Sequence, residues 1–331
     1  MFSVEGIFDM KAFRIISILS IFIFVGSFTA CESSPKSKAR NANHSADWLD
    51  NEISYFYKHK DYDRACELLL AFFDSSSSLN HEAAWYMPVA YFFSNIFKTD
   101  VAFAELKEIY KSASEDERMF IGIMLALYHT EKHERTLKDI NELETNKDLK
   151  AVFLDISEFS KSNDPLKQEV KTAEHLDILW GIFFATGDTL PIKKIASVLA
   201  WEDLFKKKIL AYKPANKKEK EEFLAILSAF NIEYTNGKLV SPVDDCDIQI
   251  IRKQKQDKQV DNFQRLVELL AFTYDELYHV ATKTSAFWSL SSNASFHEIV
   301  HAECLKIAEN KSLPESKLML YVLIEATMNL Q

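Results

Sequence analysis

Apolar positions recur at helical spacing along most of the chain beyond residue 45. One stripe contains Leu49, Ile53 and Phe56, and a second stripe runs over 62–69 after a polar turn at 58–61. Residues three and four positions apart share one face of a helix, so each stripe predicts an amphipathic helix. We therefore expect a mainly α fold in which antiparallel helix pairs bury their apolar faces against each other. The last helices are predicted over 285–292, 295–309 and 315–329.

Residues 231–240 interrupt the helical pattern. Asn236 and Gly237 stand between two short alternating segments, and Asn-Gly is the pair that a two-residue hairpin turn favours. The next segment, 241–260, contains an acidic cluster followed by a run rich in Lys and Gln, and it has little apolar periodicity. The pattern predicts a short β-hairpin near 231–240 and a linker over 241–260. The linker would separate a helical, repeat-like domain over 45–240 from a C-terminal helical subdomain over 261–331.

Three segments resemble the opening of the second helix in a tetratricopeptide-type (TPR-like) repeat. They cover 60–69, 99–106 and, with a weaker match, 132–137, at intervals of roughly 32 to 39 residues. In that family an alanine near this point lets two helices approach closely. The resemblance covers 45–145 and implies an array of helix pairs with an extended interaction surface. The array is degenerate, since the usual tight-turn glycines are missing and Pro88 falls early in a helix.

The N-terminal segment has the layout of an export signal. Lys11 and Arg14 precede an apolar run over 15–25, after which small residues lead to Cys31. The uncharged stretch over 15–30 is shorter than the roughly 20 residues that a membrane-spanning helix needs. Removal of the segment is therefore the leading interpretation, with ordinary secretion or a retained anchor as the alternatives.

The end of this segment, Gly-Ser-Phe-Thr-Ala-Cys over 26–31, resembles the lipobox of bacterial lipoproteins. The resemblance implies that a dedicated peptidase removes residues 1–30 as a signal peptide. It also implies that the thiol of Cys31 carries a diacylglycerol and that the new amino group is often acylated as well. Several acyl chains make a durable anchor, whereas one chain alone binds reversibly.

Two neighbouring segments add to this interpretation. Glu5 and Asp9 are unusual in the first region of a signal, which favours translation from Met10. Residues 32–44 are polar and poor in apolar side chains, so we expect a flexible tether between Cys31 and the folded body. The implied location is the bacterial cell envelope, on a membrane outside the cytoplasm, and the sequence leaves open which membrane.

Composition narrows the function classes. The chain has a net charge of −10 and only six glycines, which opposes a general nucleic-acid partner and glycine-rich phosphate loops. Besides Cys31 there are three cysteines: Cys66, Cys246 and Cys304. Their odd number forbids complete pairing within the chain, and we expect buried free thiols, with a Cys246–Cys304 disulfide left open.

One catalytic pattern stands out, His-Glu-x-x-His over 297–301, which matches the motif of zinc metallopeptidases. On one helix, His297 and His301 would share a face and could hold zinc, while Glu298 would activate a metal-bound water. The resemblance nominates Glu325 as a third ligand. The alternative is a helix whose apolar face packs into the core, with the histidines beside it and no metal.

Weaker candidates have structural interpretations. His129 and His133 have helical spacing, but a turn between them is expected to break their common face. The cluster over 244–247 offers acidic and thiol ligands, although an acidic surface turn explains it. The aromatic stretch over 85–103 is expected to be core rather than a peptide groove.

The sequence as a whole favours a lipid-anchored, noncatalytic helical protein that binds another envelope protein or a peptide. The alternative is a membrane-tethered zinc peptidase that uses the motif at 297–301.

Overall fold

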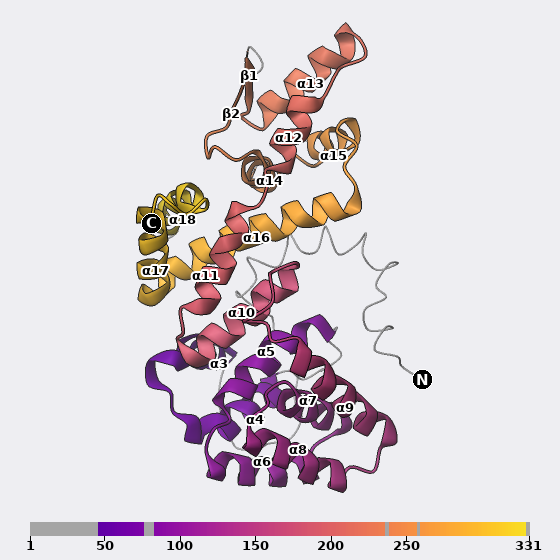
Figure 1. Cartoon of the computed structure of the whole chain (residues 1–331), viewed down its shortest axis with the longest axis vertical. Coiled ribbons are helices and arrows are strands. Elements are labelled where there is room, and N and C mark those ends of the chain that lie inside the picture. Colours follow the sequence, from indigo (N-terminus) through magenta and orange to yellow (C-terminus); the bar gives the residue numbers. More distant parts are fainter. Residues whose placement is uncertain (1–45, 76–82, 236–237, 257–258, 329–331) are drawn as a thin grey trace. The chain divides into compact units, whose positions relative to one another are not determined.

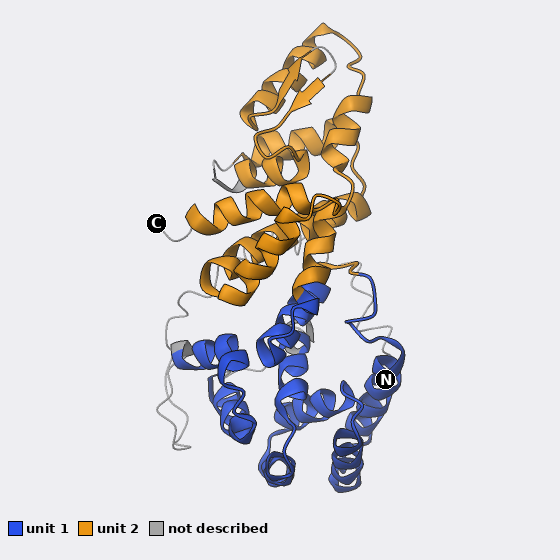
Figure 2. Ribbon diagram, turned by 60° about the vertical axis from the view of Figure 1, so that its left-hand side comes forward, with its two compact units in different colours: residues 1–11, 31–169, 174–191 blue, residues 12–30, 170–173, 192–331 orange. Residues whose placement is uncertain are grey.

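The computed structural model describes residues 46–75, 83–235, 238–256 and 259–328, and the sequence features at 1–45 lie outside this range. The chain is mainly helical and contains one small antiparallel sheet, as the apolar pattern predicts (Figure 1). It divides into two compact units (Figure 2). Unit 1 contains the described residues up to 169 and residues 174–191, whereas unit 2 contains 170–173 and the residues from 192 onward. None of the described helices has the length and apolar content that a bilayer crossing requires.

The described part of unit 1 is a run of helices, with a 3-10 turn at Tyr62–Arg64. Its helices are α3 (Ala46–His59), α4 (Ala65–Ser75), α5 (Ala83–Ile96), α6 (Asp100–Ser112), α7 (Glu115–Ala126), α8 (Glu131–Leu143), α9 (Lys147–Ser162) and α10 (Ala173–Thr186).

Six of these helices stack in two rows. Helices α4, α6 and α8 form one row and α5, α7 and α9 form the other, because each helix packs on the helix two places further along the chain (Figure 1). The packing is consistent with the predicted repeat-like array of antiparallel helix pairs. The three segments with second-helix character, 60–69, 99–106 and 132–137, all fall at or near the starts of α4, α6 and α8.

Small residues bring the first two helices of that row together. Ala65 and Ala102 are fully buried, and the Cys66 thiol donates a hydrogen bond to the Ala102 carbonyl oxygen at 3.3 Å. The aromatic stretch supplies the neighbouring row, where the rings of Phe92 and Phe93 are buried in edge-to-face contact. The expectation that this stretch forms core therefore holds for its described aromatic side chains.

Helix boundaries follow local signals. Ser114 and Glu117 form a capping box before α7. Gly187 ends α10 with a φ of +68°, a conformation that glycine adopts without strain. Gly181 allows α10 to approach α5, because a Cβ atom at this position would lie 2.3 Å from the carbonyl oxygen of Pro88.

Unit 2 contains a long central helix, α16, with shorter helices packed around it. Helices α14, α17 and α18 pack directly on α16, and α12 packs on α14. The elements are α11 (Leu190–Ser197, of which residues from 192 belong to this unit), a 3-10 turn (Val198–Ala200), α12 (Leu204–Ala211), α13 (Lys217–Ala229), β1 (Glu233–Thr235), β2 (Lys238–Val240), α14 (Cys246–Gln256), α15 (Val260–Leu269), α16 (Tyr274–Phe296), α17 (Glu298–Glu309) and α18 (Ser316–Met328).

The predicted hairpin is confirmed. Strands β1 and β2 pair antiparallel, with Tyr234 opposite Leu239. The Asn-Gly turn at 236–237 lies outside the described residues.

The prediction of a linker over 241–260 is wrong. Most of this segment forms α14, in which Ile248, Ile250 and Ile251 are almost completely buried. Because α14 packs against α12, α15 and α16, more than one of its faces is covered, and a one-sided apolar stripe does not arise. The division between the compact units lies near residue 191 instead.

Candidate functional site

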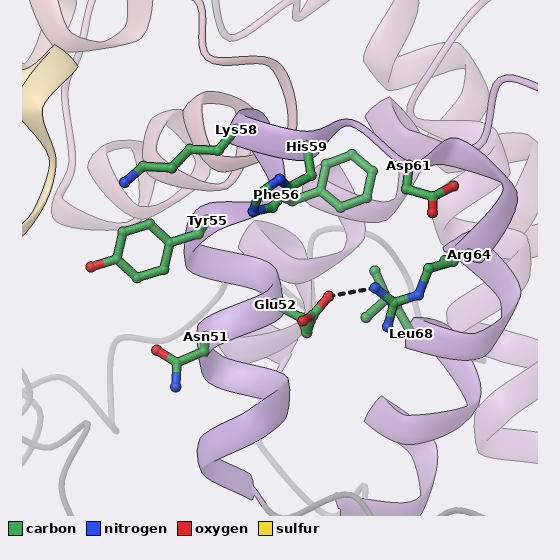
Figure 3. Close-up of a pocket in the computed structure, with 9 residues that line it drawn as sticks. All are labelled: Asn51, Glu52, Tyr55, Phe56, Lys58, His59, Asp61, Arg64 and Leu68. Carbon is green, nitrogen blue, oxygen red and sulfur yellow. Dashed lines mark hydrogen bonds and ion pairs between the residues drawn. The ribbon is translucent and has the colours of Figure 1, made fainter.

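The surface of unit 1 carries an open depression of about 420 Å³ at the start of the helix array (Figure 3). Helix α3 and the turn into α4 form its walls. Polar, charged and aromatic side chains line it: Asn51, Glu52, Tyr55, Phe56, Lys58, His59, Asp61, Arg64 and Leu68. We refer to it as the α3–α4 depression.

Ion pairs hold one wall of the α3–α4 depression in place. Arg64 Nη1 lies 2.8 Å from Glu52 Oε2, and Arg64 Nε lies 2.9 Å from Glu67 Oε2. The hydrogen bond to Glu67 and the charges of both carboxylates raise the pKa of Arg64 further above its usual value. Lys58 Nζ lies 4.6 Å from the centre of the Tyr55 ring. The depression thus combines a fixed guanidinium with an exposed ammonium and an aromatic face, groups that suit hydrogen bonding and stacking with a polypeptide.

Unit 2 contains a buried cluster of three carboxylates and one lysine. Asp203 precedes α12, Asp245 and Asp247 lie at the start of α14, and Lys283 lies within α16. Lys283 Nζ is 2.5 Å from Asp245 Oδ2 and 3.6 Å from Asp247 Oδ2, and Lys283 itself is fully buried. Among the described residues, these three aspartates form the one group of potential metal ligands, and their ligand atoms lie within 4.8 Å of one another.

Every oxygen atom of these carboxylates accepts a hydrogen bond. Asp247 accepts two from α12, Asp203 accepts one from α12 and one from α14, and Asp245 accepts one from α14 and one from Lys283. Carboxylates at helix N-termini satisfy free backbone amides and favour the positive end of the helix dipole. The aspartates therefore cap α12 and α14 reciprocally. The donor amides belong to Leu204, Phe205, Lys206, Cys246 and Ile248.

The charges of this cluster are strongly coupled. Burial, together with repulsion from Asp203, raises the pKa of Asp245 and of Asp247, and Lys283 opposes this shift. Burial alone would lower the pKa of Lys283, but attraction to Asp245 and Asp247 raises it. Because Asp245 and Asp247 are buried, the interpretation of 244–247 as an acidic surface turn is wrong for both. Lys283, a lone cation among apolar and small residues, was overlooked in the sequence and was the clue to a buried acidic partner.

The residues of the predicted zinc motif are separated. His297 stands between α16 and α17 with φ −122° and ψ 109°, whereas His301 lies inside α17. The His297 side chain is buried, while His301 and Glu298 are exposed. Glu325 Oε1 lies 2.6 Å from Arg252 Nη2. The expectation that both histidines share one helical face is therefore wrong, because the helix breaks at His297.

The second histidine pair is also split, as the sequence predicts. Thr130 caps α8, so His129 lies outside the helix and His133 lies inside it. His129 Nε2 is 2.8 Å from Ser160 Oγ, whereas His133 Nε2 is 3.0 Å from the Ser94 carbonyl oxygen.

Acid should destabilise unit 1 through His133. Burial lowers the pKa of His133 to about 4, compared with about 6.5 in an unfolded chain. The unfolded state therefore binds the proton more tightly. The neutral imidazole makes its full contribution to the free energy of unfolding above pH 6.5. This contribution, roughly 3 kcal/mol, is lost as the pH falls towards 4. Urea unfolding of wild type and His133→Gln across this range should show a smaller acid dependence in the variant; an equal dependence would contradict the assignment.

Cys66 and Cys304 are buried free thiols, as predicted, and Cys246 is a buried free thiol as well. Burial raises the pKa of Cys66 and of Cys304 to about 12, so both stay protonated at neutral pH. Cys246 and Cys304 do not pair in the described structure.

No family model, no curated protein and no solved structure matches this chain in comparisons with known proteins. The candidate sites therefore depend on the geometry of the chain itself.

Proposed function

We propose that the protein is a noncatalytic interaction module whose helical array binds another envelope protein or a peptide. The observation that carries the proposal is the α3–α4 depression, which opens at the first helix pair of a stacked array. Stacked helix pairs form extended, fairly rigid surfaces on which side chains for recognition are held in place. The Arg64 ion pairs give the depression such a fixed wall.

The proposal includes a membrane anchor. Lipid on Cys31, followed by the tether over 32–44, would hold the folded units near a membrane of the bacterial envelope. The support is the lipobox resemblance at 26–31, together with the polar composition of the tether.

Crosslinking in intact cells tests the interaction. We expect the tagged full chain to enrich at least one protein or peptide over an unrelated lipidated protein that carries the same tag. The double variant Tyr55→Ala and Lys58→Glu should lose most of that enrichment, because it removes the aromatic face and reverses the exposed charge. A matched variant on another exposed site, Leu143→Ala with Lys138→Glu, should retain it. Enrichment that is absent, or equal in both variants, would contradict the proposal.

A further inference from the structure

Positive charge is concentrated where α12 passes into α13. Residues 213–220 contain four lysines and one glutamate in a chain whose net charge is −10. All four lysine side chains are exposed. Helix α13 lies at one end of unit 2, together with the β1–β2 hairpin (Figure 1). We call this surface the lysine tip, and it consists of Lys213, Lys217, Lys218 and Lys220.

Nearby acidic groups do not neutralise the lysine tip. Glu219 is directed to the Tyr212 hydroxyl and to the Ala215 amide at 3.1 Å, and Glu222 pairs with Arg265 at 2.7 Å. Lys217 forms a loose, exposed pair with Glu221 at 3.6 Å. The other three lysines form no ion pair with any residue for which the structure gives a position. Their charge therefore faces solvent.

The position of these lysines is unfavourable for the helix itself. Asn216 caps α13, and Lys217, Lys218 and Lys220 follow within its first turn. A helix N-terminus carries a partial positive charge, so cations there weaken the helix. The same arrangement attracts anions, because the lysines and the free amides of the first turn act in the same direction.

We propose that the lysine tip docks unit 2 on an anionic phospholipid surface. Clusters of four to eight basic residues are typical of protein segments that bind anionic lipids, whereas lysine is depleted in protein–protein interfaces. The neighbouring Tyr212 packs on Phe223 and Arg265 is paired with Glu222, so the lysines are the groups that the tip offers to solvent. Leu210, near the end of α12 and three residues before Lys213, is 47% exposed, and an exposed leucine close to basic residues suits the headgroup region of a bilayer. This contact does not depend on the proposed lipid at Cys31 or on the α3–α4 depression.

Vesicle partitioning tests the proposal. Full-length protein would be mixed with vesicles of phosphatidylcholine alone, and with vesicles of equal parts phosphatidylcholine and phosphatidylglycerol. The readout is the ratio of the two partition coefficients, in which any contribution of the N-terminal apolar run is shared by all variants. The triple variant Lys213→Gln, Lys218→Gln and Lys220→Gln should lower this ratio by on the order of 100-fold, at about 1 kcal/mol for each charge.

A matched variant separates the lysine tip from net charge. Lys138→Gln, Lys147→Gln and Lys171→Gln remove the same charge from exposed positions elsewhere, and should leave the ratio nearly unchanged. Circular dichroism would confirm that both variants keep their helix content. Equal losses in the two variants, or a wild-type ratio near one, would overturn the proposal. The proposal would also be overturned if the tip variant lost binding to an acidic protein while its ratio of partition coefficients stayed at the wild-type value.

Discussion

Replacing Lys283 by Met should destabilise unit 2 by about 3–5 kcal/mol, a large part of the 5–15 kcal/mol that typically stabilises a folded domain. Methionine keeps most of the apolar stem and removes the ammonium group. Asp245 Oδ2 would lose its donor, and three carboxylates would remain together in a buried site. Hydrogen exchange should rise in the peptides of α12, α14 and α16, because the aspartates cap or adjoin these helices.

An exposed ion pair provides the control for this experiment. Lys207 Nζ lies 2.8 Å from Glu202 Oε2 with both side chains more than half exposed, so Lys207→Met should cost at most about 1 kcal/mol. Adding Asp245→Asn to Lys283→Met should recover part of the stability, since asparagine still caps α14 and removes one buried charge. The structural role of the cluster would be refuted by equal costs for the variants at 283 and 207.

Replacing Cys31 by Ser should move the protein from the membrane fraction to the soluble or secreted fraction, or leave an unprocessed precursor. Serine has no thiol to accept a diacylglycerol, so the durable anchor would be lost. Mass spectrometry of the wild-type N-terminal peptide should show a chain that begins at Cys31 and carries added acyl mass.

Cys66→Ser is the matched control, because it also removes one thiol and lies in the described core rather than in the segment that resembles a lipobox. Its fractionation should follow wild type, although its stability is expected to fall. An unmodified N-terminus at another residue would contradict the anchor, and so would membrane association that is the same in the Cys31→Ser variant as in wild type.

The helices could be predicted where one face is apolar and the other is solvated. The stripe at Leu49, Ile53 and Phe56 follows this rule, and the structure places it in α3. Helix α14 was missed because neighbours cover more than one of its faces, so burial does not produce a regular period. The sequence pattern places the break between two of the last helices at 293–294, whereas the structure continues α16 to Phe296 and breaks at His297.

The candidate sites were harder to predict, because they join residues that are distant in the sequence. Asp203 and Lys283 are separated from Asp245 by 42 and 38 positions, and no local pattern brings them together. The α3–α4 depression depends on the angle between two helices, which spacing alone does not determine. The signal that could have revealed the cluster is Lys283, the one lysine of α16, because a buried lysine requires a partner of opposite charge.

Site-specific photo-crosslinking at the α3–α4 depression tests the central claim most directly. A photoreactive phenylalanine derivative would replace Tyr55 in one strain and Leu154 in another; Leu154 is 55% exposed on α9 and lies outside the depression. We expect light-dependent adducts of defined mass from position 55 and few or none from position 154. No adduct at 55, or the same adducts at both positions, would contradict an interaction site at the α3–α4 depression.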